Sequence, residues 1–221
     1  VFTSSNACFA NFAEAFNVSY DKIMVMPLPC VDLLTNPKHI KASRKKVLSK
    51  YKDINKKKVI LYAPTFRKNF DMTGDINSLI NEVDFSKYNL VIKLHPLSDV
   101  VIDDERVIFD KSFSTIDMAV VSDYVITDYS AVVFEIALLN KPLFFYAFDK
   151  ESYLDERNFY MDFDKDMPGI ISTSAKEIIK AIENNKYDLN KVKKFANDNV
   201  AKVYGGYTNN ISKFIIGLLN K

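Results

Sequence analysis

Long apolar runs and tryptophan are missing from this chain of 221 residues, and cysteine is scarce. Because no stretch of about 18 or more residues is apolar throughout, the sequence predicts no transmembrane helix, and no signal peptide is recognised. The two cysteines, Cys8 and Cys30, follow no disulfide or metal-binding spacing. This pattern favours two reduced thiols in a cytosolic protein.

Glycine is also scarce, with five residues in the whole chain. The sequence contains neither the G-x-G-x-x-G pattern of nicotinamide dehydrogenases nor the G-x-x-x-x-G-K-[ST] pattern of P-loop enzymes, which argues against both classes. No group of cysteine, histidine and acidic residues has metal-ligand spacing, and no serine lies in a nucleophile elbow. The sequence therefore predicts no metal site.

Strong charge of either sign is absent, because 30 lysines and arginines face 28 aspartates and glutamates. A net charge of +2 does not support nucleic-acid binding, which requires a concentrated basic face. Only four basic residues are arginines, whose forked side chains suit phosphate recognition. They are Arg44, Arg67, Arg106 and Arg157.

From residue 59 onward, apolar stretches typical of strands alternate with stretches typical of helices. The expected strands are 59–63, 90–94, 107–109, 124–127, 143–148 and 169–171, and the expected helices are 76–83, 114–121, 131–139, 175–184, 189–203 and 207–219. An aromatic, charged loop is expected at 153–163. This alternation predicts an α/β fold with a Rossmann-like, doubly wound parallel sheet.

The first part of the chain is expected to form a separate lead-in segment, residues 1–55, before the Rossmann-like domain at 56–221. A capped helix is predicted at 3–16 and a short strand at 21–26. The lysine-rich region 41–58 is predicted to be helical up to residue 51, and a solvated helix face is the preferred interpretation. Contact with an anionic membrane surface is the alternative. The chain begins without methionine, and we interpret it as a fragment of a longer protein.

The stretch Tyr124–Phe148 organises the rest of the chain. Its strand, helix and strand are joined by short connections, which predicts parallel strands with a right-handed crossover. Asp128 or Ser130 is expected to cap the helix. Ligands of open parallel sheets bind at the carboxyl edge of the strands, and a helix N-terminus suits a phosphate.

Polar residues cluster at the predicted carboxyl ends of the strands. They are Thr65, Arg67, His95, Thr127, Asp128, Tyr129 and Ser130, together with Glu135 in the following helix and Arg157 in the aromatic loop. Two arginines, a histidine, hydroxyl groups and a helix N-terminus together suit a diphosphate. Each residue also has a plain structural interpretation: His95 can simply close a strand, Arg67 can pair with an acid, and Asp128 or Ser130 can merely cap a helix.

Four ordered motifs extend this interpretation to a family. They are APTFRKN (63–69), VIKLHP (91–96), SDYVITDYSAVVFEIALLNKPLFFYAFD (122–149) and YLDERNFYMDFDKDMPGIIS (153–172). Together they resemble the CDP-glycerol glycerophosphotransferases that prime or polymerise teichoic acids and related capsules. The N-terminal part also resembles the family, whose members have a Gly-x-Pro-Arg-x-Asp turn here. This chain lacks that glycine and arginine but keeps the aspartate, Asp32.

The resemblance implies the C-terminal, donor-binding half of a GT-B fold. It places His95 and Arg67 at the donor phosphates as catalytic residues. It assigns the diphosphate to the segment Thr127–Ala131 with Thr65, and the ribose to Glu135. Arg157 and Tyr160 would close over the site.

The implied reaction is displacement at the β-phosphorus of a CDP-linked polyol by an acceptor hydroxyl. The donor is a substrate, and no cofactor is implied. The acceptor would be a polymer or a lipid-linked chain at the inner face of the plasma membrane. The family's N-terminal His-Gly-Thr motif is absent, so part of the active site is expected elsewhere. A GT-B sugar transferase, a nucleotide-sugar 2-epimerase and a non-catalytic nucleotide-binding remnant remain alternatives.

Overall fold

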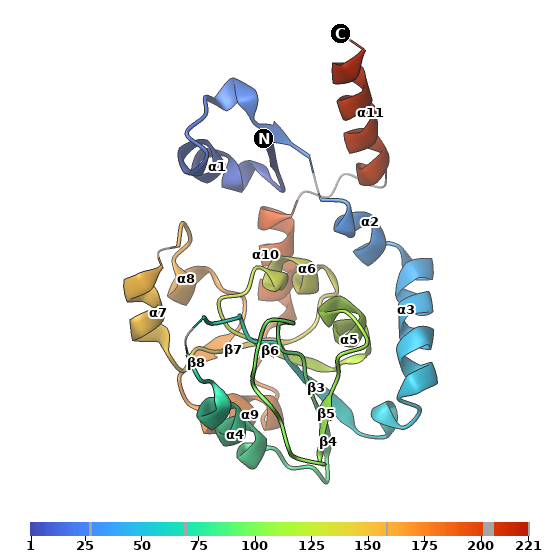
Figure 1. The fold of residues 1–221 in the computed structure, drawn as a ribbon, viewed down its shortest axis with the longest axis vertical. Coiled ribbons are helices and arrows are strands. Elements are labelled where there is room, and N and C mark those ends of the chain that lie inside the picture. The colour runs from blue at the N-terminus through green and yellow to red at the C-terminus, as the bar shows by residue number, and fades with distance from the viewer. Residues whose placement is uncertain (27, 69, 158, 201–205, 221) are drawn as a thin grey trace.

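Six parallel strands form the central sheet of the computed structural model, which describes residues 1–26, 28–68, 70–157, 159–200 and 206–220 (Figure 1). The strands are β3 (Lys58–Tyr62), β4 (Tyr88–Ile92), β5 (Val107–Phe109), β6 (Tyr124–Thr127), β7 (Leu143–Tyr146) and β8 (Ile170–Ser172). Their order is β5-β4-β3-β6-β7-β8. The chain thus winds outward from β3 in one direction and from β6 in the other. The predicted doubly wound parallel sheet is confirmed, and its switch point lies between β3 and β6.

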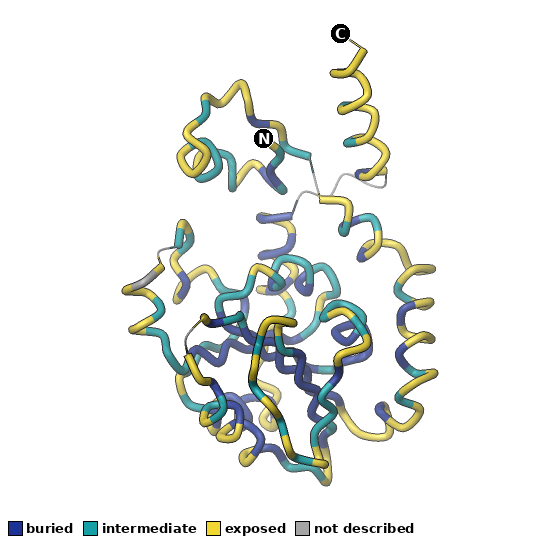
Figure 2. Tube along the Cα trace, viewed as in Figure 1, coloured by how far each residue is buried: buried dark blue, intermediate teal, exposed yellow. Residues whose placement is uncertain are grey.

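Helices cover both faces of the sheet. On one face lie α3 (Pro37–Lys50), α5 (Thr115–Val121), α6 (Val132–Leu138) and α10 (Leu189–Asn199), and on the other lie α4 (Thr73–Glu82) and α9 (Ala175–Glu183). Side chains alternate along each strand, so Val59 and Leu61 enter the first core while Ile60 and Tyr62 enter the second. Figure 2 shows the strands as the most deeply buried part of the molecule.

The lead-in segment differs from its prediction at the N-terminus. It begins with β1 (Phe2–Thr3), which pairs in parallel with β2 (Met24–Val25), and a 3-10 turn at Asn6–Cys8 precedes α1 (Phe9–Ala15). The single helix expected at 3–16 is therefore wrong in its first third. Ser5 precedes the 3-10 turn but makes no capping bond with its side chain.

The lysine-rich helix α3 packs on the same core as the sheet. Val47 is completely buried there, and the Ser43 hydroxyl donates to Asp117 Oδ1 over 2.5 Å. Two shorter elements flank α3, namely α2 (Cys30–Leu34) and a 3-10 turn (Ile54–Lys56). A division of the chain at residue 55 stays a prediction.

The aromatic segment predicted as a loop contains two short helices. These are α7 (Lys150–Glu156) and α8 (Phe163–Asp166), so the loop prediction is wrong at residues 153–156 and 163. Tyr153 stacks on Tyr129 at 3.9 Å between ring centres, and this packing holds α7 against the turn after β6. Residue 158 lies outside the described residues.

The C-terminal helix α11 (Tyr207–Leu219) begins at a cap supplied from a distant part of the chain. The Asp32 carboxylate accepts hydrogen bonds from the backbone N–H groups of Gly206, Tyr207 and Thr208 at 3.0, 3.1 and 2.9 Å. Gly206 has φ +85°, a left-handed conformation that favours glycine. In Figure 1, α11 lies at the same end of the molecule as the N-terminal unit, by which we mean residues 1–26 with β1, α1 and β2. Positions 201–203 of the predicted helix 189–203 lie outside the described residues.

None of the helices in the described part of the chain combines the length and the apolar character that a membrane crossing requires.

Candidate functional site

Arg67 lies at the centre of the carboxyl edge of the sheet, with a side chain that is 5% exposed. Its Nη1 donates to Asp128 Oδ2 at 2.8 Å and to the Thr65 carbonyl at 2.7 Å. Its Nη2 donates to Asp149 Oδ1 at 2.9 Å, and its Nε donates to the other oxygen of the same carboxylate. Most of the guanidinium donors are therefore used inside the protein, as the ion-pair interpretation anticipated.

Asp128 joins the turns that follow β3 and β6. Its Oδ1 accepts from the Thr65 backbone N–H at 2.8 Å and from the Thr65 hydroxyl at 2.6 Å. The neighbouring Thr127 hydroxyl donates to the Ala63 carbonyl at 2.8 Å. Both side chains thus link the two central strands at the switch point, and Asp128 does not cap α6.

Burial sets the electrostatics of this cluster. Loss of water raises the pKa of Asp128, while the charge of Arg67 works in the opposite direction. Burial also works to lower the pKa of Arg67, but the hydrogen bonds that Arg67 donates to Asp149 and the charge of Asp128 outweigh it and leave that pKa above its ordinary value. Burial, followed by the charges of Asp149 and Asp128, raises the pKa of Tyr129. Tyr129 is therefore a neutral phenol at physiological pH.

Three aromatic rings surround the Arg67 guanidinium. Its Cζ lies 4.6 Å from the ring centre of Phe148, 5.6 Å from that of Tyr129 and 5.7 Å from that of Tyr153. The Tyr129 hydroxyl also donates to Asp149 at 3.3 Å. Cation–π contacts and ion pairs together hold the turn after β6 against α7.

The turn that leads into α6 presents backbone donors. Ala131, which has φ −60°, occupies the N-cap position, and the Ser130 hydroxyl accepts from the Val132 N–H at 3.3 Å. Within the described residues, no group accepts a hydrogen bond from the backbone N–H of Tyr129, Ser130 or Ala131. Adjacent unpaired N–H groups of this kind form an anion-binding concavity.

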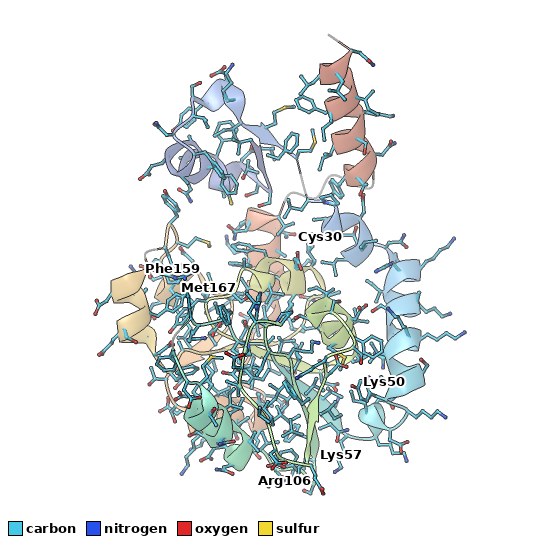
Figure 3. All side chains as sticks on the ribbon, viewed as in Figure 1. Cys30, Lys50, Lys57, Arg106, Phe159 and Met167 are labelled. Carbon is cyan, nitrogen blue, oxygen red and sulfur yellow. The ribbon has the colours of Figure 1, made fainter. Side chains whose placement is uncertain are left out.

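A cavity of about 210 Å³ lies beside this turn. Its lining residues come from the turn and from the α7–α8 region: Asp128, Tyr129, Ser130, Ala131, Val133, Phe134, Phe159, Tyr160, Met161, Phe163 and Met167. Figure 3 shows Phe159 and Met167 close together on the α7–α8 side of the molecule. The cavity is mostly apolar, and the turn supplies its polar wall.

His95 lies on the loop after β4, where it is exposed. Its Nδ1 accepts from the Leu97 N–H at 3.2 Å, so the neutral ring carries its hydrogen on Nε2. The ring lies 5.1 Å from that of Phe66, on the loop after β3. His95 therefore offers a hydrogen-bond donor at this edge of the sheet.

A buried ion pair supports the end of β4, the strand that precedes His95. Lys93 Nζ donates to Asp110 Oδ2 at 3.0 Å and to the backbone carbonyls of Asp110 and Phe113 at 2.8 and 2.6 Å. Asp110 also accepts from the Tyr51 hydroxyl at 2.7 Å. The network joins the ends of β4, β5 and α3.

Glu135 lines a separate cavity, whereas Arg157 lies near Tyr153, one of the rings that surround Arg67. Glu135 lines a second cavity, of about 420 Å³, together with Cys30, Phe12 and Leu138. Burial, and then the charge of Glu135, raises the pKa of the Cys30 thiol to about 11. Arg157 is exposed, with its Cζ 5.9 Å from the Tyr153 ring centre. Ala131 lines both cavities, so the two cavities are neighbours at the turn.

Two important residues escaped the sequence reasoning, namely Asp149 and Lys93. Asp149 follows the apolar strand β7, so the rule that selected Asp128 after β6 could also have found it. Lys93 lies two residues before His95, but its partner Asp110 belongs to another strand and only the fold brings them together.

The hydrogen-bond donors of this site, rather than its charged groups, suit an anionic ligand. No set of three or more potential metal-ligating side chains gathers anywhere in the described part of the chain. Asp128 and Asp149 both bind Arg67, so their oxygens already have a cationic partner. The groups left for a ligand are the N–H donors of the turn and the ring of His95.

Comparison with known proteins identifies a family and several relatives. The model of the family described as "CDP-Glycerol:Poly(glycerophosphate) glycerophosphotransferase" matches residues 1–217. The chain is 31% identical to a teichoic acid ribitol-phosphate primase of Bacillus spizizenii, over 98% of this chain and 58% of the relative. It is 34% identical to a teichoic acid glycerol-phosphate transferase of Staphylococcus aureus, over 78% of this chain and 47% of the relative. The chain thus spans about half the length of these relatives.

Solved structures share the fold. A variant of the wall teichoic acid polymerase TagF, soaked with CDPG, matches with a TM-score of 0.81 and 26% identity, over 99% of this chain and 57% of that one. A UDP-GlcNAc 2-epimerase of Methanocaldococcus jannaschii matches with a TM-score of 0.58 and 14% identity, over 94% of this chain and 58% of that one. The second likeness concerns the fold alone.

Proposed function

This chain belongs to the CDP-glycerol:poly(glycerophosphate) glycerophosphotransferase family, and we propose that it supplies the donor site of a polyol-phosphate transferase. The donor would be CDP-glycerol or another CDP-polyol, and the acceptor would be a hydroxyl group of a growing teichoic acid or capsule chain. The turn Tyr129–Ala131 carries the proposal. No group in the described part of the chain accepts a hydrogen bond from its backbone N–H groups, and it lies at the switch point of a parallel sheet, where ligands of this fold bind.

The proposed reaction is an in-line displacement at the β-phosphorus of the donor. The acceptor oxygen forms a bond to phosphorus, the bond from phosphorus to the bridging oxygen breaks, and CMP leaves with that oxygen. The turn would hold the diphosphate by backbone donors, and His95 would donate from Nε2 to a phosphate oxygen. The base that takes the acceptor proton is not assigned to a residue of this chain.

In the proposed site, Arg67 is a positioning residue that holds the turn. Its guanidinium pairs with Asp128 and Asp149 and lies among aromatic rings. Thr65 and Thr127 have similar roles, since each bonds to a group on the neighbouring turn. These contacts would keep the turn in a fixed geometry, so that no reorganisation is needed when the donor binds.

The ribose would lie at Glu135, and the loop with Arg157 and Tyr160 would close the site. Support comes from the position of Ala131, which lines the cavity of Glu135 as well as that of Tyr160. A donor with its diphosphate on the turn could therefore extend toward the carboxylate of Glu135, which can accept bonds from ribose hydroxyls.

Calorimetry with the purified chain tests the proposal. CMP and CDP-glycerol should bind more tightly than UDP-GlcNAc, and preference for UDP-GlcNAc would favour an epimerase-like site. The variant Ala131→Pro removes one backbone N–H, while φ −60° at this position is compatible with proline. Loss of one charge-assisted hydrogen bond should weaken CDP-glycerol binding about tenfold or more. Ala131→Ser keeps the N–H and is the matched control.

The basic helix α3 supports a membrane as a further partner and the inner face of the plasma membrane as the location. Its 14 residues include six lysines and arginines and no carboxylate. Such a surface suits peripheral contact with the anionic inner leaflet of the plasma membrane, where a lipid-linked acceptor would lie. Sedimentation with vesicles that contain anionic lipid tests this contact, and equal binding to neutral vesicles would argue against it.

A further inference from the structure

Cys30 and Glu135 line the same cavity of about 420 Å³, although they come from distant parts of the chain. Cys30 is the first residue of α2, and Glu135 lies in the first turn of α6. The two helices are in contact, and Cys30 packs against the same small core as Phe134 and Leu138 of α6. Figure 3 shows Cys30 where α2 lies beside α6. The fold therefore brings a thiol and a carboxylate together in one cavity.

The thiol of Cys30 is a neutral donor to this carboxylate. Burial raises the pKa of Cys30 to about 11, and the charge of Glu135 and a hydrogen bond between the two side chains add to the rise. The sulfur therefore keeps its hydrogen at physiological pH, and the carboxylate accepts it. An ionised carboxyl group has about four acceptor positions on its two oxygens, and a thiol is a weak donor that uses one of them. Most of the acceptor capacity of Glu135 is thus left for a ligand.

An arginine in place of Cys30 would have the opposite effect. Pro29 and Asp32 match the proline and the aspartate of the family's Gly-x-Pro-Arg-x-Asp turn, so Cys30 stands where that turn has arginine. A guanidinium beside Glu135 would donate to both carboxylate oxygens and compensate its charge. No ion pair among the residues that the structure describes includes Glu135. A ligand can therefore use this carboxylate by bringing its own hydrogen-bond donors.

Two neighbouring hydroxyl groups suit a carboxylate held in this way, because each oxygen can accept from one of them. Glu135 is the one charged residue among the described residues that line this mostly apolar cavity. We propose that Cys30 is a positioning residue, which holds the Glu135 carboxylate toward the vicinal hydroxyls of a ligand and so selects a sugar that carries both. The proposal rests on the proposed function, which places the ribose at Glu135.

Calorimetry with the purified chain compares CMP with dideoxy-CMP, which lacks both ribose hydroxyls. The native chain should bind CMP about tenfold to a hundredfold more tightly, because its hydroxyls donate to a charged group. Without the thiol, the Glu135 side chain can occupy about three staggered rotamers, of which one faces the ligand. Cys30→Ala should therefore lower the ratio of the two affinities about threefold. Cys30→Ser keeps a donor of similar size and should retain the native ratio.

Cys8 offers the matched control, because it lines the same cavity while its sulfur accepts from the Ser5 hydroxyl at 3.6 Å. Cys8→Ala removes the same group from the same cavity and should leave the ratio unchanged. An equal fall of the ratio in Cys8→Ala and Cys30→Ala would overturn the proposal. Weaker binding of both ligands by Cys30→Ala at an unchanged ratio would also overturn it, since the thiol would then have a structural role only.

The variant Glu135→Gln separates this proposal from the proposed function. If Glu135→Gln lowers the ratio and Cys30→Ala does not, the ribose lies at Glu135 and the role of Cys30 is refuted. If the native chain binds CMP and dideoxy-CMP equally, the ribose lies elsewhere and the selection by Cys30 is refuted with it. If CMP does not bind at all, the donor site itself is wrong.

Discussion

Arg67 and Asp149 form a two-point ion pair, in which Nε and Nη2 of the guanidinium donate to the two oxygens of one carboxylate. The two residues follow different strands, β3 and β7, and both side chains are almost fully buried. Asp128 occupies the opposite side of the guanidinium. The pair therefore braces the edge of the sheet on which the turn Tyr129–Ala131 lies.

Removal of the Arg67 side chain should destabilise the fold. Arg67→Ala would leave Asp128 and Asp149 buried without their cationic partner, at a cost of about 3–5 kcal/mol. Urea unfolding followed by circular dichroism measures this loss. Arg106→Ala is the matched control, because its pair with Asp104 is exposed and should contribute less than about 1 kcal/mol. Similar stability in the two variants would contradict the bracing role.

The ring of His95 should contribute to donor binding with little effect on folding. His95→Ala removes an exposed donor, and loss of one hydrogen bond to a charged phosphate should weaken CDP-glycerol binding about tenfold to a hundredfold. His39→Ala is the control, since His39 is the other histidine and is also exposed. Unchanged affinity in a folded His95→Ala protein would place the phosphates elsewhere.

The stability of the native chain should rise between about pH 8 and pH 10 because of Lys141. Its Nζ donates to the carbonyls of Val120 and Ser122 at the end of α5, and burial lowers its pKa from 10.5 to about 8. The unfolded lysine binds its proton more tightly, so rising pH favours the folded state over this range. Lys141→Met should lack this component of the pH dependence. Parallel melting curves for both proteins from pH 8 to 10 would contradict the lowered pKa.

The cap on α11 should depend on the Asp32 carboxylate. Asp32→Ala removes an acceptor for three backbone N–H groups and should cost about 0.5–2 kcal/mol. These bonds lower the pKa of Asp32, so the cap contributes above the ordinary aspartate range and is lost as pH falls through the lowered value. Limited proteolysis near residue 206 measures release of the helix. Asp99→Ala, at an exposed aspartate, should leave the cleavage rate unchanged.

Neutralisation of Glu135 should make the Cys30 thiol more acidic. Burial raises the pKa of Cys30 first, and the charge of Glu135 adds to that rise, so Glu135→Gln removes only the second cause. The rate of Cys30 alkylation between pH 8 and 10, followed by mass spectrometry, should therefore increase. Glu14→Gln, at an exposed position, is the control. An unchanged rate in Glu135→Gln would show that the two groups do not interact.

Much of the fold could be predicted because its signals are local. Tyr124–Thr127 is a short β-branched and aromatic run, and the structure has a strand with the same bounds. The alternation of such runs with helical stretches was sufficient to predict the parallel sheet. The loop prediction failed at residues 153–156 because the aromatic residues suggested a loop, whereas the stacking of Tyr153 on Tyr129 is a tertiary contact.

By itself, the sequence determined that this protein has a doubly wound parallel sheet, and its ordered motifs identified the family. Residue order also brought Thr65, Arg67 and Asp128 to one edge, because parallel strands end on the same side. Only the tertiary structure decided how these side chains are used. Arg67 and Asp128 are deeply buried, and a buried charge requires a partner inside the protein. The two side chains therefore bind each other. The turn that follows Asp128 then lines the cavity.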